Sequence, residues 1–170
     1  MAPKPIRPIR VEGNVAYVPL TRGYEAIIDA ADVPLVDAWN WFAFPHGGTC
    51  YARRTEYSGG KISGILLHRV LLAAPADALV DHRDGNGLNN TRANLRIATF
   101  AENARNARLR KDNVSGYKGV YLESSSGRWK AGIRIGGKHH SLGYFATPES
   151  ASAAYRDASA RLHGEFGRPE

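Results

Sequence analysis

A chain of 170 residues is long enough for one ordinary domain or two small ones. With 43% hydrophobic and 23% charged residues, its composition is that of a soluble globular protein and excludes a disordered or fibrous chain. The formal net charge of +7 and the pI of about 9.8 favour a polyanionic partner.

The sequence also argues against membrane and disulfide-bonded classes of protein. No stretch approaches the roughly 18 apolar residues that span a bilayer, and prolines interrupt the N-terminal segment, so we expect a cytosolic protein without a membrane partner. The single cysteine, Cys50, excludes an internal disulfide and the usual cysteine-based zinc finger. We expect Cys50 to be a small buried or half-buried apolar residue.

The first half of the chain predicts short strands separated by turns. Runs with strand character lie at 14–20, 24–29, 41–44, 51–57 and 61–66. Short helices are predicted at 31–39 and at 66–74, the second ended by Pro75. The aromatic side chains of this half are assigned to its core, namely Trp39, Trp41, Phe42 and Phe44.

Two short apolar runs follow Pro75 and flank a polar loop. The predicted strands are 79–82 and 94–98, and the loop 83–93 is rich in Gly and Asn, which favour turns. Thr99 followed by Glu102 fits a capping box, so a helix is predicted there, with Asn103 in its first turn and Arg110 towards its end. Residues 112–115 are the predicted linker.

The last third predicts three strands followed by a helix. The strands are 117–122, 128–135 and 139–145, and the helix runs from Pro148 to Gly164. The middle strand alternates basic and apolar positions, which predicts one basic face and one apolar face packed on Ala154, Tyr155, Ala158 and Leu162. The predicted fold class is α+β, with a β-rich N-terminal part and a C-terminal three-stranded antiparallel sheet packed on one helix.

Four polar residues around the loop are candidates for a catalytic site. A strand–loop–strand–helix unit folds back on itself, so Asp81, His82, Asn94 and Asn103 can converge on one site the size of a metal ion. Hydrolysis of a phosphodiester needs a base with a near-neutral pKa and a hard cation. His82 supplies the base, Asp81 and Asn103 supply oxygen ligands for Mg²⁺, and Asn94 is placed to orient His82.

These residues lie in motifs that resemble the HNH homing endonucleases of phages and mobile introns. The segments are VDHRDGNGLNN at 80–90, NLR at 94–96 and ENARN at 102–106, preceded by LHRV at 67–70. The resemblance implies a ββα-metal fold at about 79–107 within a nuclease domain spanning 1–111. It makes His82 the general base, Asp81 and Asn103 the ligands of one Mg²⁺ or Mn²⁺, and Asn94 the residue that braces the histidine. It gives His68 no chemical step.

The other polar residues of the loop have a simpler interpretation. Asp84, Asn86, Asn89 and Asn90 are predicted to act as turn formers. A calcium loop is disfavoured, because the EF-hand spacing and its closing glutamate are absent.

Basic residues gather downstream of these motifs. From Arg105 to Lys138 there are nine basic residues against two acidic ones, so this segment carries as much net charge as the whole chain. We expect Arg105, Arg108, Arg110 and Lys111 to lie along a phosphate backbone. The alternative is a solvated helix end without a partner.

The C-terminal segment is similar to the plant ethylene-response-factor type of DNA-binding domain. The matching blocks are YKGVY at 117–121, WKAGIR at 129–134 and LGYFATPE at 142–149, with AAY at 153–155, in a domain spanning 116–170. The resemblance implies that the sheet enters the major groove and contacts DNA through Lys118, Tyr121, Arg128, Arg134 and His139. The alternation of the middle strand adds Lys130 to these DNA-binding residues. The plant domains carry further Arg and Trp residues where this chain has Tyr121 and Ser141, so their sequence preference is not transferred. Trp129 is assigned to the core.

Two functions are consistent with these features. The favoured one is a Mg²⁺-dependent endonuclease acting on double-stranded DNA, without a small-molecule substrate. The alternative is a DNA-binding transcriptional regulator with a relic nuclease domain, which the presence of Asp81, His82, Asn94 and Asn103 disfavours. The oligomeric state is left open.

Overall fold

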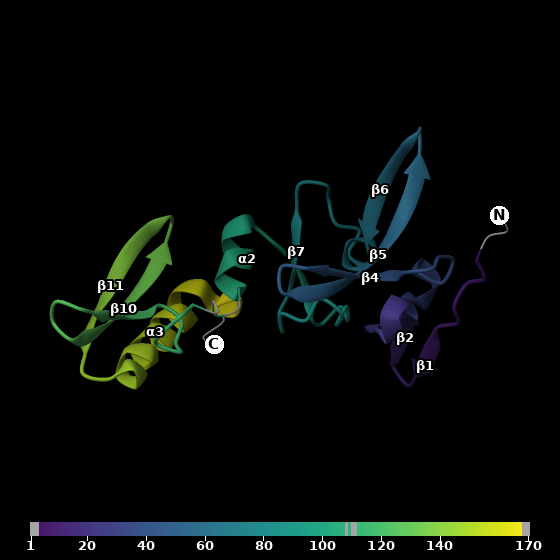
Figure 1. Cartoon of the computed structure of the whole chain (residues 1–170). Helices are drawn as coiled ribbons and strands as arrows, with labels where there is room; N and C mark the ends of the chain where they lie inside the picture. The colour runs from purple at the N-terminus through teal and green to yellow at the C-terminus, as the bar shows by residue number, and fades with distance from the viewer. Residues whose placement is uncertain (1–3, 108, 110–111, 168–170) are drawn as a thin grey trace. The chain divides into compact units, whose positions relative to one another are not determined.

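The computed structural model describes residues 4–107, 109 and 112–167 and divides into two compact units, Met1–Phe100 and Ala101–Glu170 (Figure 1). Across these described residues, no helix has the length and apolar character needed to cross a membrane. The predicted domain limits, 1–111 and 116–170 with a linker at 112–115, stay a prediction. Each unit is described by itself.

The first unit consists of small antiparallel sheets. Its strand orders are β1-β2-β3, β4-β5-β6 and β7-β8. In chain order, its elements are β1 (Arg10–Glu12), β2 (Val15–Pro19), η1 (Thr21–Gly23), β3 (Glu25–Asp29), η2 (Ala30–Leu35), β4 (Phe42–His46), β5 (Thr49–Ser58), β6 (Lys61–Leu66), α1 (Leu67–Leu71), β7 (Leu79–His82) and β8 (Leu95–Ala98).

One apolar core holds the sheets of this unit together. It combines the inward positions of β2, β3, β4 and β5 with α1 and β8, and its largest fully buried side chain is Trp41. The indole nitrogen of Trp41 donates to the carbonyl of Val36 at 3.0 Å, so burial leaves this polar group satisfied. Cys50 is half-buried against the same core, as predicted.

Three of the four aromatic residues assigned to the core lie elsewhere. Trp39 is 42% exposed, and the Arg54 guanidinium lies 4.4 Å from its ring centroid. Phe42 and Phe44 are only half-buried, because they alternate along β4 with the buried Ala43 and occupy the opposite face of the sheet. The core assignment was therefore correct for Trp41 alone.

The two short helices predicted in this unit also differ from the structure. The first is a 3₁₀ segment, η2, which ends at Leu35 and contains Pro34. The second, α1, ends at Leu71, and Ala73 adopts a positive φ of 46° that cannot continue a right-handed helix. The strand β1 was not predicted.

The second unit contains most of α2 (Phe100–Asn106), then β9 (Val120–Glu123), β10 (Arg128–Ile135), β11 (Lys138–Phe145), α3 (Pro148–His163) and η3 (Gly164–Phe166). The strand order β11-β10-β9 is antiparallel. The helix α3 begins at Pro148 after Thr147, whose hydroxyl accepts from the amide of Ser150 at 3.2 Å, and it ends at His163 with Gly164 as its C-cap. Helix α2 begins after Thr99 as predicted but ends at Asn106, well before Arg110.

The sheet of the second unit packs its apolar face on α3. Ile133 of β10 contacts Tyr155 and Ala158, and Ala131 packs with Val120 and Ala151. The predicted packing of Leu162 is wrong, because this side chain is 50% exposed and the buried face of the helix runs through Ser152, Ser159 and His163. Trp129 packs against the core as predicted. Together, the antiparallel sheets and few helices of the two units confirm the α+β class.

Candidate active site

The loop between β7 and β8 is fixed against the first sheet. The two strands pair so that His82 lies opposite Leu95 and Asp81 opposite Arg96. Backbone hydrogen bonds join the loop to β3, from Ile27 N to the Leu88 carbonyl at 2.8 Å and from Asn90 N to the Ile27 carbonyl at 2.7 Å. The loop is therefore fixed to β3 by backbone hydrogen bonds.

Gly87 allows the same loop to approach β5. A Cβ atom at this position would lie 2.5 Å from the carbonyl oxygen of Cys50 and 2.7 Å from the ring of Tyr51. The Gly87 amide donates to the hydroxyl of Thr49 at 3.1 Å. The loop thus packs closely on β5, with Tyr51 beside the candidate catalytic histidine.

His82 is buried and oriented by an asparagine. It is 5% exposed, and its Nε2 lies 3.2 Å from Oδ1 of Asn90, which is fully buried. The Asn90 amide donates to the Gly87 carbonyl at 3.4 Å, which sets its oxygen towards the imidazole. Because an amide oxygen only accepts, Nε2 carries the proton and Nδ1 is the nitrogen that can accept one. Burial lowers the pKa of His82, so its ring is neutral at pH 7.

Asn94 holds the two ends of the loop together. Its Oδ1 accepts from the amide of Asp84 at 3.0 Å, and its Nδ2 donates to the carboxylate of Asp84 at 2.9 Å and to the Asn89 carbonyl at 2.7 Å. Its backbone carbonyl accepts from the amide of Arg83 at 2.9 Å. Because Asn89 precedes Asn90, Asn94 fixes the segment from which Asn90 contacts His82.

Among the residues predicted to form turns, Asn90 has a further contact. Asp84 accepts hydrogen bonds from the Asn86 amide at 2.8 Å and from the side chain of Asn89 at 2.8 Å, as expected of turn formers. Burial raises the pKa of Asp84, whereas these hydrogen bonds and that of Asn94 lower it. The hydrogen bonds outweigh burial, so the net shift of the pKa is downward. Asn90 instead bonds the histidine. From the sequence, Asn90 could be predicted only as a turn-forming asparagine of the loop.

Asp81 forms a buried ion pair across the hairpin. Arg96, directly opposite on β8, donates to Oδ2 of Asp81 from Nη2 at 2.7 Å and from Nε at 2.9 Å. The two residues are 5% and 7% exposed. Arg96 therefore compensates the carboxylate charge in a site where an uncompensated charge would be costly.

The second predicted metal ligand belongs to the other unit. Asn103 lies exposed on α2, and its role beside Asp81 stays a prediction. Within the described ranges, no three His, Cys, Asp or Glu side chains cluster as a metal site. The predicted pair, one carboxylate and one amide, is a different kind of donor set, which would suit a hydrated hard cation such as Mg²⁺.

Two ring side chains next to His82 were not assigned a role from the sequence. The rings of His68 and His82 are perpendicular, with centroids 5.0 Å apart, and the Tyr51 ring lies 5.6 Å from His68 and 5.8 Å from His82. Burial, followed by the charges of His82 and Arg69, lowers the pKa of His68 to about 3. His68 is therefore uncharged at neutral pH, and its ring packs against that of His82.

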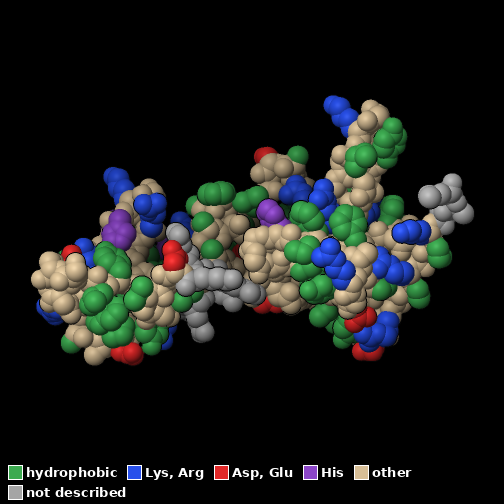
Figure 2. All heavy atoms as spheres, in the orientation of Figure 1, with side chains coloured by type: hydrophobic (Ala, Val, Ile, Leu, Met, Phe, Trp, Pro, Cys, Tyr) green, Lys and Arg blue, Asp and Glu red, His purple; other side chains and the backbone are tan. Residues whose placement is uncertain are grey.

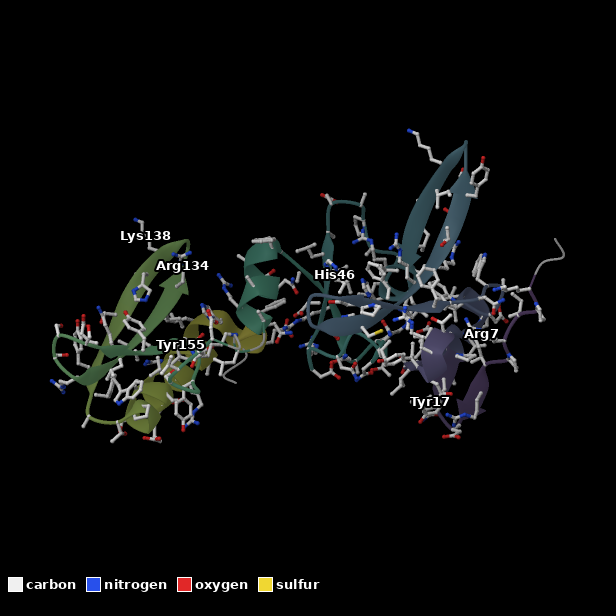
Figure 3. The ribbon with its side chains drawn as sticks, viewed as in Figure 1. Arg7, Tyr17, His46, Arg134, Lys138 and Tyr155 are labelled. Carbon is white, nitrogen blue, oxygen red and sulfur yellow. The ribbon has the colours of Figure 1, made fainter. Side chains whose placement is uncertain are left out.

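In the second unit, the predicted DNA-binding residues of the sheet share one face. Tyr121 pairs with Lys130 and Arg134 pairs with His139, while Arg128 precedes Lys130 by two positions. Tyr144, which was not predicted, lies opposite Lys130, and the Lys130 ammonium is 5.2 Å from its ring centroid. Figure 3 shows Arg134 and Lys138 near the β10–β11 turn, away from Tyr155 on α3.

The predicted basic residues outside the strands have other positions. The ammonium of Lys118 donates to the carbonyls of Arg105 and Ala107, the second at 2.8 Å, so its charge lies at the C-terminal end of α2. Arg105 is half-buried on that helix. The remaining three residues lie outside the described residues: Arg108, Arg110 and Lys111.

The chain was compared with protein families, curated proteins and solved structures. No family model matches it, and no solved structure matches it either. Over 154 residues it is 32% identical to a protein of Acanthamoeba polyphaga mimivirus named as an uncharacterized HNH endonuclease, covering 87% of this chain and 75% of that protein. It is 35% identical over 94 residues to Protein 3.8 of Escherichia phage T7, covering 55% and 77% respectively. The chain belongs to the HNH endonuclease family.

Proposed function

We propose that the protein is a metal-dependent DNA endonuclease in which His82 is the general base. The observation that carries the proposal is the setting of this histidine, which is buried and held through Nε2 by Asn90. Burial also lowers its pKa. A base with these properties accepts a proton through Nδ1 without first losing one, and its orientation needs no adjustment during the reaction. Family membership supports nuclease chemistry for this site.

Asp81 and Asn103 are the proposed ligands of one Mg²⁺ or Mn²⁺. The cation would neutralise charge on the phosphate and on the departing 3′ oxygen. Asp81 is proposed because it supplies a carboxylate oxygen and directly precedes His82 in β7. Strands β7 and β8 with helix α2 would then form the ββα-metal module.

Each remaining side chain of the site has a role in the proposed reaction. His82 takes the proton of the attacking water. Asn90 keeps the imidazole in the required tautomer, and Asn94 acts through the loop by holding Asp84 and Asn89. His68 and Tyr51 cover two sides of the imidazole and exclude water from them.

The sheet β9-β10-β11 is proposed to hold the DNA duplex. Its outer face carries Tyr121, Arg128, Lys130, Arg134 and His139, and Figure 2 shows basic side chains gathered at the end of the β10–β11 hairpin. Arginines on a narrow sheet can contact base edges in the major groove, and lysines contact phosphates. This unit would supply affinity for DNA, while the first unit supplies the chemistry.

Conversion of supercoiled plasmid tests the nuclease proposal. We expect the protein to produce nicked or linear plasmid with Mg²⁺ and none with a chelator. His82→Ala should abolish conversion. The matched control is His140→Ala, because His140 is an exposed histidine opposite Ile133, away from the basic face. Absence of Mg²⁺-dependent conversion by the parent protein across varied DNA sequences would reject the proposal and favour a DNA-binding regulator.

A further inference from the structure

The β4-β5-β6 sheet has an outer face that the proposed chemistry does not use. Antiparallel pairing places Phe44 beside Tyr51, and Tyr57 beside Ile62, on the face opposite the buried Ala43 and Ala52. Arg53 and Gly64 lie between these two pairs. We call this face the outer strip, and it consists of Phe44, Tyr51, Arg53, Gly64, Tyr57 and Ile62.

One end of the outer strip is the candidate active site. Tyr51 is part of the strip, and its ring lies 5.8 Å from that of His82. The close approach of Gly87 to Tyr51 fixes this junction. A polymer bound along the strip would therefore continue directly to the catalytic histidine.

The other end is the tip of a projecting hairpin. The outer parts of β5 and β6 extend away from the rest of the first unit (Figure 1), and hydrophobic and basic side chains are exposed at this tip (Figure 2). Tyr57 and Ile62 are direct cross-strand partners and are 74% and 75% exposed. Lys61 follows the turn next to them. Two large apolar side chains so exposed indicate a contact surface.

Arg53 lies in the middle of the strip, between Phe44 and Gly64. Its guanidinium carbon lies 4.6 Å from the ring centroid of Phe44. A Cβ at Gly64 would overlap the guanidinium, at 1.9 Å from Nε, so only glycine leaves room for it there. Stacking presents the guanidinium edge, with its N–H donors, along the surface.

The charge of this face favours nucleic acid over protein. The six strip residues include no acidic residue, and the nearby Glu56 lies on the other face, where it pairs with Arg54 at 3.0 Å. The guanidinium of Arg53, beside the aromatic rings of the strip, suits contact with a phosphate backbone. Apolar side chains such as Ile are used as wedges in the minor groove.

We propose that the outer strip binds the DNA duplex next to the cleaved phosphate. Arg53 contacts the phosphate backbone, and the Tyr57–Ile62 pair enters the minor groove farther from the site. This inference rests on the proposed function, because it identifies how the substrate of that site is held. It gives the first unit a DNA contact independent of the β9-β10-β11 sheet.

A site-specific cross-link tests the contact without requiring cleavage. In the full chain, Tyr57 is replaced by p-benzoylphenylalanine and irradiated with a random-sequence duplex in the presence of a chelator. The control carries the same replacement at Tyr24, which is 45% exposed but lies outside the strip. We expect cross-linking at position 57 well above that at position 24. Equal cross-linking yields at the two positions would overturn the proposal. This is also the result expected if the strip binds a protein instead of DNA.

Displacement of Arg53 tests the contact from a second direction. Gly64→Ala would move the guanidinium without removing its charge, because every close atom belongs to the end of a flexible side chain. We expect Gly64→Ala and Arg53→Gln each to weaken duplex binding about fivefold, the loss typical of one phosphate contact. The matched control is Arg10→Gln, since Arg10 also stacks on an aromatic ring, 4.0 Å from that of Tyr17. Unchanged binding by both strip variants would contradict the proposal.

The failures of the two proposals are distinguishable. If the parent protein cleaves DNA while the strip variants bind and cleave as Arg10→Gln does, the strip proposal is wrong and the nuclease proposal stands. The opposite result is that the parent protein cleaves no DNA, while position 57 still cross-links to the duplex. In that case the nuclease proposal is wrong and the strip remains a DNA-binding surface.

Discussion

The loop around His82 and the outer face of the β9-β10-β11 sheet organise polar groups in opposite ways. In the loop, Asn90 and Asn94 are almost fully buried, and each bonds several partners. On the sheet, Arg134 and His139 are exposed at positions fixed only by strand alternation. The contrast is that expected between the proposed catalytic site, which is preorganised, and the proposed DNA-binding surface, which is adaptable. Loss of one side chain should therefore be costly in the loop and modest on the sheet.

Arg96→Met should give the largest effect. Removal of the guanidinium takes the ion-pair partner from the buried carboxylate of Asp81, at a cost of about 3–5 kcal/mol in the free energy of unfolding. Urea denaturation measures the loss. If Asp81 also holds a cation, Mg²⁺ should raise the melting temperature of Arg96→Met more than that of the parent protein. An unchanged stability would show that Asp81 and Arg96 do not form this buried pair.

Asn90→Ala should reduce catalysis without reducing affinity. Removal of the acceptor from Nε2 frees the imidazole to change tautomer, so we expect kcat to fall about 100-fold and KM to stay near the parent value. Asn86→Ala, in the exposed part of the same loop, is the control. A rise in KM with unchanged kcat would assign Asn90 to DNA binding instead.

Acidification should destabilise the first unit through His68. Its pKa of about 3 in the folded state lies below the unfolded value near 6.5, so the unfolded chain binds more protons between these limits and stability falls as pH falls. From pH 7 to pH 5 the loss is about 2 kcal/mol. In urea denaturation at the two pH values, His68→Phe should lack this loss of stability. An equal loss in His68→Phe would place the acid sensitivity elsewhere.

Arg134→Ala should give the smallest effect. An exposed arginine on the sheet surface contributes one DNA contact, so we expect duplex binding to weaken by about 1 kcal/mol, or roughly fivefold, with no change in folding. Gel-shift titration measures the affinity. The control is Arg156→Ala, because Arg156 is exposed on α3, away from the basic face. A loss of stability in Arg134→Ala would contradict the distinction between loop and sheet.

The sequence was sufficient wherever local pattern determines structure. The bounds of β6 and β10 agree with the predicted strands, and Thr147, Pro148 and Gly164 define α3 as expected. Residue alternation predicted that Arg128, Lys130 and Arg134 share one face, and the pairing of β10 with its neighbours agrees. These features depend on neighbours in sequence, and the period of a strand or helix is visible in the residues themselves.

The sequence was insufficient wherever distant segments meet. The bond from Asn90 to His82 depends on how the loop pairs with β3, and no local signal separates Asn90 from Asn89. The stacking of Arg54 on Trp39 and the contact of His68 with His82 likewise join residues that are distant in sequence. Tertiary packing determines each of these, so they required the structure.

Chemical rescue of His82 tests the central claim most directly. In His82→Gly, the general base is removed and a cavity the size of the ring is left beside Tyr51 and His68. We expect this variant to lose Mg²⁺-dependent plasmid cleavage and to regain part of it when imidazole is added, with no rescue of Asp81→Ala. Cleavage by His82→Gly at the parent rate without imidazole would contradict the assignment of His82 as the base.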